Sequence, residues 1–150
     1  MKRLASGGLV VVAALVMVIT MARGAGPSGV TRTEMGRGTV ADGYTVTGDA
    51  RTDVVVQAVR FEPGASAPWH THPGPEVAIV KSGTLTWVNG EDPHCAARTY
   101  TAGQVVVGPG HVHQGRNLGT QPVELVVSYY NVPPGAPATT PTERPAHCPA

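Results

Sequence analysis

The sequence predicts an all-β fold, built as a sandwich or barrel of short strands. Short β-branched segments recur along the chain, and turn signals separate them at regular intervals. No stretch after residue 25 shows a helical period. The 150 residues include 19 Gly and 14 Pro, a content that favours many turns over long helices. A chain of this length has room for one domain around one hydrophobic core.

The charge balance gives no sign of a nucleic-acid-binding surface. Lys and Arg number 11 and Asp and Glu number 10, so the formal net charge is +1 with His neutral. A protein that tracks phosphates needs a basic patch or stripe, and none is visible in the sequence. We therefore predict no nucleic-acid partner.

Residues 1–25 have the layout of a secretory signal peptide. Lys2 and Arg3 precede an apolar run from Leu9 to Ala22, and small residues follow that run. The run is ~14 residues long, shorter than the ~20 that cross a bilayer, but extension back to Leu4 leaves an uncleaved anchor as the alternative. The protein is expected to be secreted or to lie in the cell envelope. The alternative is an extracytoplasmic domain on a membrane anchor, with no membrane contact beyond this segment.

The two cysteines fit an exported chain. Cys95 and Cys148 are an even count, so a disulfide between them is the leading interpretation, and two unrelated thiols are the alternative. Each cysteine also follows a histidine, His94 and His147. A zinc site of two His and two Cys is a third interpretation, although adjacent ligands are unlike the usual spaced pairs.

Four segments organise the chain. Residues 1–25 are set aside, and residues 26–50 are predicted to be a linker with edge strands at 37–41 and 44–47. Residues 51–131 carry the barrel. Its predicted strands are 54–61, 69–72, 77–81, 84–88, 98–101, 104–107, 113–118 and 123–131. Residues 132–150 contain six prolines, which predicts an extended tail that joins neither sheet nor helix.

A cluster of potential metal ligands lies in the barrel region. His70 and His72 are two apart in a predicted strand, so both imidazoles share one face. Glu76 follows a turn stiffened by two prolines, which can fold the next strand back toward them. His113 begins a later strand. Three imidazoles and a carboxylate suit one divalent transition metal, Mn, Fe, Ni, Cu or Zn, and the site should weaken in acid.

Four other residues of the barrel region have predicted roles of their own. His111 shares a face with His113 if the strand begins early, but the turn signal at Pro109-Gly110 favours a side chain that points elsewhere. Trp87 and Tyr129 are expected to line either the pocket or the core, and the core is the favoured interpretation. Asn117 is expected to make a backbone or turn hydrogen bond.

These residues carry a resemblance to the cupin family. The fixed positions of the first cupin motif are matched by Gly64, His70, His72, Glu76 and Gly83. The second motif is matched by Gly103, Pro109, His113 and Asn117. The distance from Pro109 to His113 is one residue short, and Gly108 stands where proline is expected. The resemblance spans about residues 50 to 131 and is that of a small single-domain cupin.

The resemblance implies a double-stranded β-helix, or jelly-roll barrel, often dimeric, with a metal in the lumen. Similar cupins include dioxygenases, isomerases, decarboxylases and plain binding proteins. We therefore expect an exported metal-binding cupin, an oxygenase-type enzyme acting on a small, mostly apolar molecule. The alternatives are a non-enzymatic metal or small-molecule binding module of the envelope and a structural barrel with a vestigial site. The sequence marks no further acid or base as catalytic.

Overall fold

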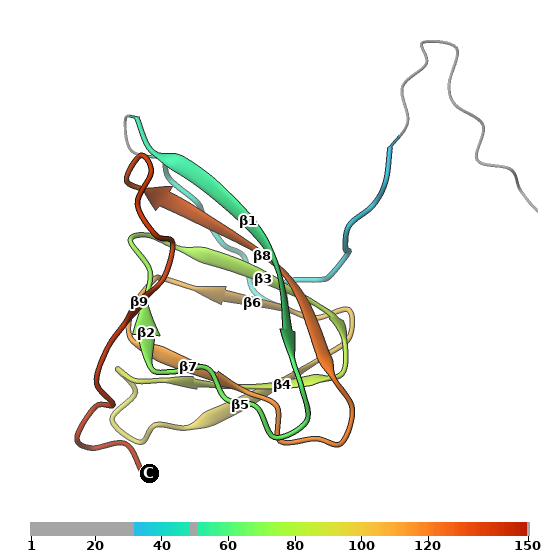
Figure 1. Cartoon of the computed structure of the whole chain (residues 1–150), viewed down its shortest axis with the longest axis vertical. Coiled ribbons are helices and arrows are strands. Elements are labelled where there is room, and N and C mark those ends of the chain that lie inside the picture. The colour runs from blue at the N-terminus through green and yellow to red at the C-terminus, as the bar shows by residue number, and fades with distance from the viewer. Residues whose placement is uncertain (1–31, 49–50, 150) are drawn as a thin grey trace, which may run out of the picture. The chain divides into compact units, whose positions relative to one another are not determined.

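The structure, a computed structural model, describes residues 32–48 and 51–149 (Figure 1). The chain divides into two compact units, residues 1–33 and 34–150, and all the strands named below belong to the second. The signal peptide or anchor expected at residues 1–25 lies outside the described residues. Within the described ranges, no helix is long and apolar enough to cross a membrane.

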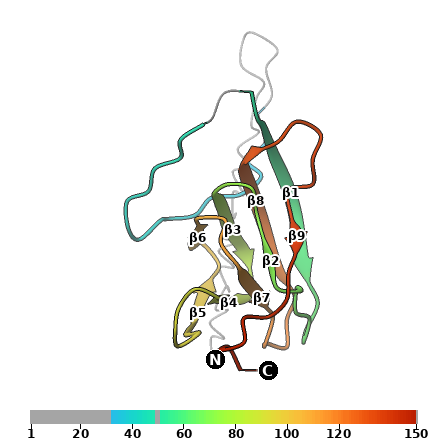
Figure 2. The same cartoon turned by 90° about the vertical axis from the view of Figure 1, so that its left-hand side faces the viewer.

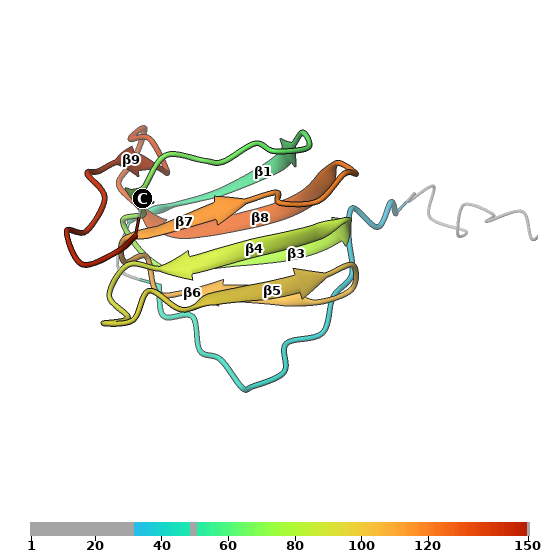
Figure 3. The ribbon, with the colours of Figure 1, turned by 90° about the horizontal axis from the view of Figure 1, so that it is seen from below.

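In the part of the chain that the structure describes, nine strands form two antiparallel sheets. The strands are β1 (Asp53–Phe61), β2 (His70–Thr71), β3 (Glu76–Ser82), β4 (Thr84–Asn89), β5 (Ala97–Thr101), β6 (Val105–Gly108), β7 (His113–Arg116), β8 (Val123–Val132) and β9 (Thr140–Pro141). One sheet has the order β1-β8-β3-β6 and the other β5-β4-β7-β2-β9. Figures 2 and 3 show the two sheets as facing layers. The all-β prediction is confirmed.

Turn chemistry explains why the strands end where they do. Gly83 joins β3 to β4 and Gly103 joins β5 to β6, with φ angles of 76° and 87°. Glycine reaches this left-handed region without the steric penalty that a Cβ atom brings. Strands β1 to β8 correspond to the eight predicted strands, with ends that differ by a residue or two.

The core fills the space between the two sheets. Alternate side chains of β3, β4, β6 and β8 point inward, which follows from the period of two in each strand. The most deeply buried of them are valines, at 0 or 1% exposure: Val80, Val106, Val123 and Val132. Asn117 is buried too, and its side-chain amide donates to the carbonyls of Phe61 and Gln121, as the predicted hydrogen-bonding role requires.

The prediction of edge strands before the barrel was wrong. Residues 37–41 and 44–47 form no strand, and Thr39 makes a single bridge to Gln104 beside β6. The glycine content of this stretch explains the difference, since glycine has no side chain to pack on a sheet. Gly38 passes so close to the barrel that a Cβ there would lie 2.6 Å from Val105 Cγ2.

The prediction for the C-terminal tail was also wrong, because the tail contributes a strand to a sheet. Strand β9 pairs with β2, with Thr140 opposite Thr71 and Pro141 opposite His70. The strand lies at the edge of its sheet, where a proline without an N–H group is tolerated. Ala138, just before it, is 6% exposed and belongs to the main core cluster.

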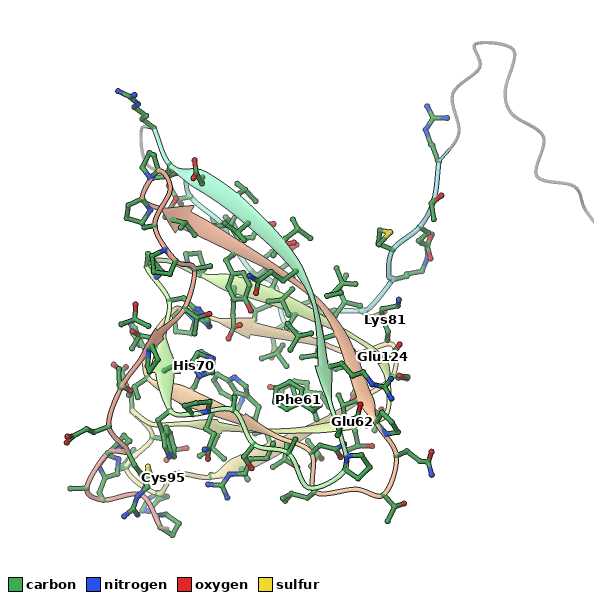
Figure 4. All side chains as sticks on the ribbon, viewed as in Figure 1. Phe61, Glu62, His70, Lys81, Cys95 and Glu124 are labelled. Atoms are coloured by element: carbon green, nitrogen blue, oxygen red, sulfur yellow. A yellow bond between two sulfur atoms is a disulfide. The ribbon has the colours of Figure 1, made fainter. Side chains whose placement is uncertain are left out.

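The predicted disulfide is present between Cys95 and Cys148, with a Cα–Cα distance of 5.4 Å. The two half-cystines pack with Trp69 and Val88 in a second apolar cluster, against which Val112 also packs. Figure 4 shows Cys95 at the end of the molecule where the tail terminates. The bridge therefore fixes the end of the tail to the five-stranded sheet.

We expect the double substitution Cys95→Ala/Cys148→Ala to lower the free energy of unfolding by about 2–4 kcal/mol. The physical reason is that the bridge spans 53 residues and restricts the unfolded chain. Urea denaturation of the variant and of oxidised wild type measures the difference. Reduced wild type is the matched control and should unfold like the variant; identical midpoints for all three proteins would contradict the prediction.

Candidate metal centre

Strand pairing brings His70, His72 and His113 together. His70 lies directly opposite His113 in the ladder between β2 and β7, and His72 follows two residues after His70 on the same face. One ring nitrogen from each histidine lies within 4.8 Å of the other two. The ring centroids are 4.3 to 5.0 Å apart. In Figure 4, the His70 side chain lies in the space between the sheets.

Each of the three imidazoles is oriented by a backbone carbonyl. The Nδ1 atom of His70 lies 2.7 Å from the oxygen of Pro68, that of His72 is 2.7 Å from the oxygen of Ala138, and that of His113 is 2.7 Å from the oxygen of His111. A carbonyl oxygen accepts but cannot donate, so each Nδ1 carries the hydrogen. This fixes one tautomer in all three rings and leaves the Nε2 lone pairs free for a metal.

Glu76 sits against two of these Nε2 atoms. Its Oε1 is 3.0 Å from Nε2 of His113, and its Oε2 is 3.3 Å from Nε2 of His72. The side chain is nearly enclosed, at 5% exposure for the residue. Glu76 lies outside the group of three histidines whose donor atoms are all within 4.8 Å of one another. The four predicted ligands are therefore neighbours, with the carboxylate to one side of the histidine triad.

Two glycines make the room that this arrangement needs. Gly108 in β6 pairs with Glu76, and a Cβ on Gly108 would lie 2.7 Å from Glu76 Oε1. Gly110 has a φ of 93°, and a Cβ there would meet the carbonyl oxygen of Gly74 at 2.5 Å. Gly108, which stands where the cupin motif has proline, therefore leaves room for the Glu76 carboxylate. The Pro109-Gly110 turn then delivers His113 to its place.

Burial and charge act against each other on the ionisable groups. Burial raises the pKa of Glu76, but hydrogen bonds with His113 and His72 and their charges outweigh it and lower that pKa to about 2. Burial lowers the pKa of His113, but its hydrogen bond to Glu76 and the carboxylate charge raise the pKa overall. Burial dominates at His70 and lowers its pKa. The Glu76 carboxylate therefore stays ionised near neutral pH, and it favours the protonated form of His113.

The His72 ring shows that the residues present fit a metal ion. Its Nε2 atom is buried and has no hydrogen-bond partner, although the Glu76 carboxylate is 3.3 Å away. A buried polar atom without a partner is destabilising unless something binds it. A cation between the three Nε2 atoms would satisfy His72, and an N₃O donor set suits first-row divalent metals. Among the described residues Trp87 Nε1 is also buried without a partner, and the metal does not explain it.

The structure separates the two alternative sets of ligands from this centre. The His111 side chain is half exposed and its Nδ1 lies 2.5 Å from Glu91 Oε2, so it points away from the triad, as the turn signal predicted. It acts instead through its backbone oxygen, which accepts from His113. Cys95, His147 and Cys148 also cluster within 4.8 Å, but both sulfurs are in the disulfide and offer no thiolate to zinc.

Two histidines of the triad, His70 and His113, line a cavity between the sheets. The cavity has a volume of about 300 Å³ and is lined mainly by apolar side chains, together with His70, Glu76 and His113. Trp87 and Tyr129, which we had assigned to the core, are core residues that also line this cavity. Burial and the Glu76 charge raise the pKa of Tyr129 to about 12, so its hydroxyl stays protonated.

Sequence reasoning missed the contribution of the tail to this site. The Ala138 carbonyl holds His72, Thr139 lines the cavity, and Pro141 lies opposite His70 in the ladder. The sequence carried one usable signal, which is that Cys148 pairs with Cys95 and so returns the tail to the barrel. Every residue has a main-chain carbonyl, so the residue type at position 138 does not reveal that its carbonyl holds His72.

Comparisons with known proteins agree with this architecture. A family model described as a cupin domain matches residues 57–129. No curated protein matches the sequence. An uncharacterised conserved protein with a double-stranded beta-helix domain from Klebsiella pneumoniae is 29% identical, with a TM-score of 0.50, and the match covers 61% of this chain and 76% of that one.

Two enzymes are also similar in structure. The DMSP lyase DddQ from Ruegeria pomeroyi is 22% identical with a TM-score of 0.51, over 61% of this chain and 44% of that one. A recombinant oxalate oxidase is 29% identical with a TM-score of 0.48, over 58% of this chain and 45% of that one. The matches span less than half the length of either enzyme. The family match and the double-stranded β-helix neighbour confirm the jelly-roll expectation, and the chain belongs to the cupin superfamily.

Proposed function

We propose that this chain is an exported, metal-dependent cupin enzyme that transforms a small organic molecule, with oxygenase-type chemistry as the leading reaction class. The observation that carries the proposal is the histidine triad, in which a backbone carbonyl holds Nδ1 of each ring, beside a buried carboxylate at a cavity that His70, Glu76 and His113 line. Three imidazoles and one carboxylate leave two positions of an octahedral ion for other ligands. Those positions are what a reaction requires and a purely structural site lacks.

His70, His72, Glu76 and His113 would hold the ion. When bound, a divalent transition metal supplies Lewis acidity and, for Mn, Fe or Cu, a route for electrons to oxygen. The carbonyls on Nδ1 keep the rings in one orientation, so no imidazole must reorganise when the ion enters. Glu76 supplies one negative charge against the cation.

Other residues shape what happens in the cavity. The apolar wall excludes water from most of the surface around the site, which strengthens electrostatic interactions inside it. Tyr129 keeps its proton and hydrogen-bonds with Thr139 of the tail. It lies opposite Glu76 in the ladder between β8 and β3. Tyr129 lines the cavity, and we propose that its hydroxyl donates a hydrogen bond to the bound substrate during turnover.

Export is part of the proposal. The apolar N-terminal run behind Lys2 and Arg3 supports it, and so does the disulfide, because such bonds persist in oxidising compartments. A homodimer remains an expectation from the family resemblance.

A non-enzymatic binding module is the second candidate, and one observation favours it. Apart from His70, Glu76, His113 and Tyr129, no described residue with an acidic or basic side chain lines the cavity. Oxygen-electrode readings on metal-loaded protein with a panel of small organic acids and alcohols separate the two candidates. Substrate-dependent oxygen uptake that is lost in His70→Ala supports the enzyme; tight ligand binding without turnover supports the module.

Protein purified without a histidine tag should contain about one equivalent of a divalent transition metal. His70→Ala, His72→Ala and His113→Ala should each lose most of it, because each removes one of three preorganised donors. His111→Ala is the matched control and should keep wild-type content, since that side chain faces Glu91 at the surface. Elemental analysis of the dialysed proteins measures the effect. Equal metal content in His72→Ala and His111→Ala would exclude the proposed ligand set.

Gly108→Ala should weaken metal binding by roughly 10- to 100-fold, the range typical of changes that disturb a ligand's orientation. The added Cβ would lie 2.7 Å from Glu76 Oε1, so the carboxylate must move. Gly43→Ala is the control, because a Cβ there meets nothing within 4 Å. Chelator competition gives both affinities, and circular dichroism checks that both variants fold. An unchanged affinity in folded Gly108→Ala would mean that Glu76 is not a ligand.

Metal affinity should fall as the pH falls, with His113 setting where the fall begins. The pKa of His113 is raised, because its bond to Glu76 outweighs the effect of burial, and the metal must displace this proton. One competing proton lowers affinity by about tenfold per pH unit below that pKa. Glu76, with a pKa of about 2, stays ionised above about pH 4 and adds no further dependence. Chelator competition at about pH 8 and about pH 6 should reveal the loss; equal affinities would argue against ligation by His113.

A further inference from the structure

The cavity beside the triad has no cationic side chain of its own. Of the described residues that line it, none is a lysine, arginine or aspartate, and its ionisable groups are His70, Glu76, His113 and Tyr129. The rest of the wall is apolar apart from Gln57 and Thr139, with Val59, Leu85 and Leu125 typical of it. A ligand must therefore find any charge compensation at the metal end alone.

Charge arithmetic at the metal end sets how many negative charges a ligand can carry. A divalent ion with Glu76 and three neutral imidazoles has a net charge of +1. One anionic group on the ligand neutralises it. A second anionic group would lie against apolar wall without a partner, where an unpaired charge is strongly disfavoured.

Gln57 is a polar residue of the cavity wall that lies one inward-facing position beyond the Glu76 row. It lies in β1 opposite Val127, whereas Tyr129, two residues further along β8, pairs with Glu76. The Gln57 row is thus about 7 Å along the strands from the Glu76 row. Gln57 lies between Val55 and Val59 on the same face of β1. It lines the cavity and is itself exposed, which places it at the mouth.

The nearest arginine on β1 does not bring a positive charge to this mouth. Arg60 has the opposite parity to Gln57 in the strand and so points away from the cavity. Its guanidinium is held by Glu62 and Glu124, at 2.7 Å each. Figure 4 labels both of these glutamates at the outer edge of the barrel, away from His70.

Resting on the proposed function, we infer the class of ligand that the cavity accepts. It is a small, mainly apolar molecule with one metal-binding anionic group and a neutral hydrogen-bonding group at its far end. The Gln57 amide hydrogen-bonds with that neutral group. A cavity of about 300 Å³ holds roughly ten water-sized groups, which bounds the ligand's size. Gln57 is the specificity-determining residue, because its amide can hydrogen-bond a neutral far group and brings no positive charge to neutralise a second anionic one.

Three rigid probes of similar shape test this inference. 4-Carbamoylbenzoate and terephthalate differ only in an amide or a carboxylate at the far end, and 4-methylbenzoate has an apolar far end. Each carries a carboxylate for the metal, and the rigid ring keeps the far group from reaching the ion. The protein is first shown to hold one equivalent of metal, and calorimetry then gives each dissociation constant.

Wild type should bind 4-carbamoylbenzoate at least about tenfold more tightly than terephthalate. Gln57→Leu should weaken binding of 4-carbamoylbenzoate and leave 4-methylbenzoate unchanged, whereas Gln57→Lys should bring terephthalate to equal or tighter binding. Gln121→Leu, at an exposed loop position outside the cavity, is the matched control and should behave as wild type.

The outcomes separate failure of this inference from failure of the proposed function. Metal-loaded protein that binds terephthalate as tightly as 4-carbamoylbenzoate, or that binds none of the three probes, overturns the inference alone. The same holds if Gln57→Leu retains the wild-type preference for the amide. Protein that takes up no metal overturns the proposed function, and the inference with it.

Discussion

The hydrogen bond from each histidine Nδ1 to a backbone carbonyl is the interaction on which the site depends. A ring that donates from Nδ1 presents a bare Nε2, so three such bonds turn three ordinary histidines into convergent donors. Two of the carbonyls, those of Pro68 and His111, lie two residues before the rings they hold. Local backbone geometry therefore sets those two rings, and the β2–β7 ladder sets them against each other.

The third carbonyl makes the tail part of the site. Ala138 is 66 residues from His72, so their hydrogen bond depends on the tail being brought back to the barrel. Three contacts return it: the β9 pairing with β2, the burial of Ala138 in the core and the bridge at Cys148. Because the bridge closes a long loop, its effect on the unfolded chain favours the state in which Ala138 is in place. The disulfide and the orientation of His72 are thus linked through one segment.

The sequence predicted those parts of the site that follow from local rules. Period two placed His70 and His72 on one face, and the proline turn returned Glu76 to them. His113 followed from the second motif despite its short spacing, and the structure explains the glycine there, since Gly108 makes room for the Glu76 carboxylate.

What the sequence did not predict depends on long-range packing or on main-chain atoms. The pairing of β9 and the hydrogen bond from His72 to the Ala138 carbonyl depend on contacts between distant segments. So does the single bridge from Thr39 to Gln104, found where an edge strand was predicted at 37–41. For Tyr129 and Trp87 the sequence left pocket and core as alternatives, with the core favoured, because residue type does not distinguish an apolar wall from an apolar interior.

The buried carboxylate also links the site to the charge of what it binds. Glu76 stays ionised, and its charge raises the pKa of His113. A divalent ion held by Glu76 and three neutral imidazoles would give the site one net positive charge. Neutrality inside the barrel is restored only when one further negative charge arrives, and no described side chain of the cavity wall supplies it. The same low-dielectric wall that makes an unpaired charge unfavourable thus favours entry of one anionic group and opposes a second.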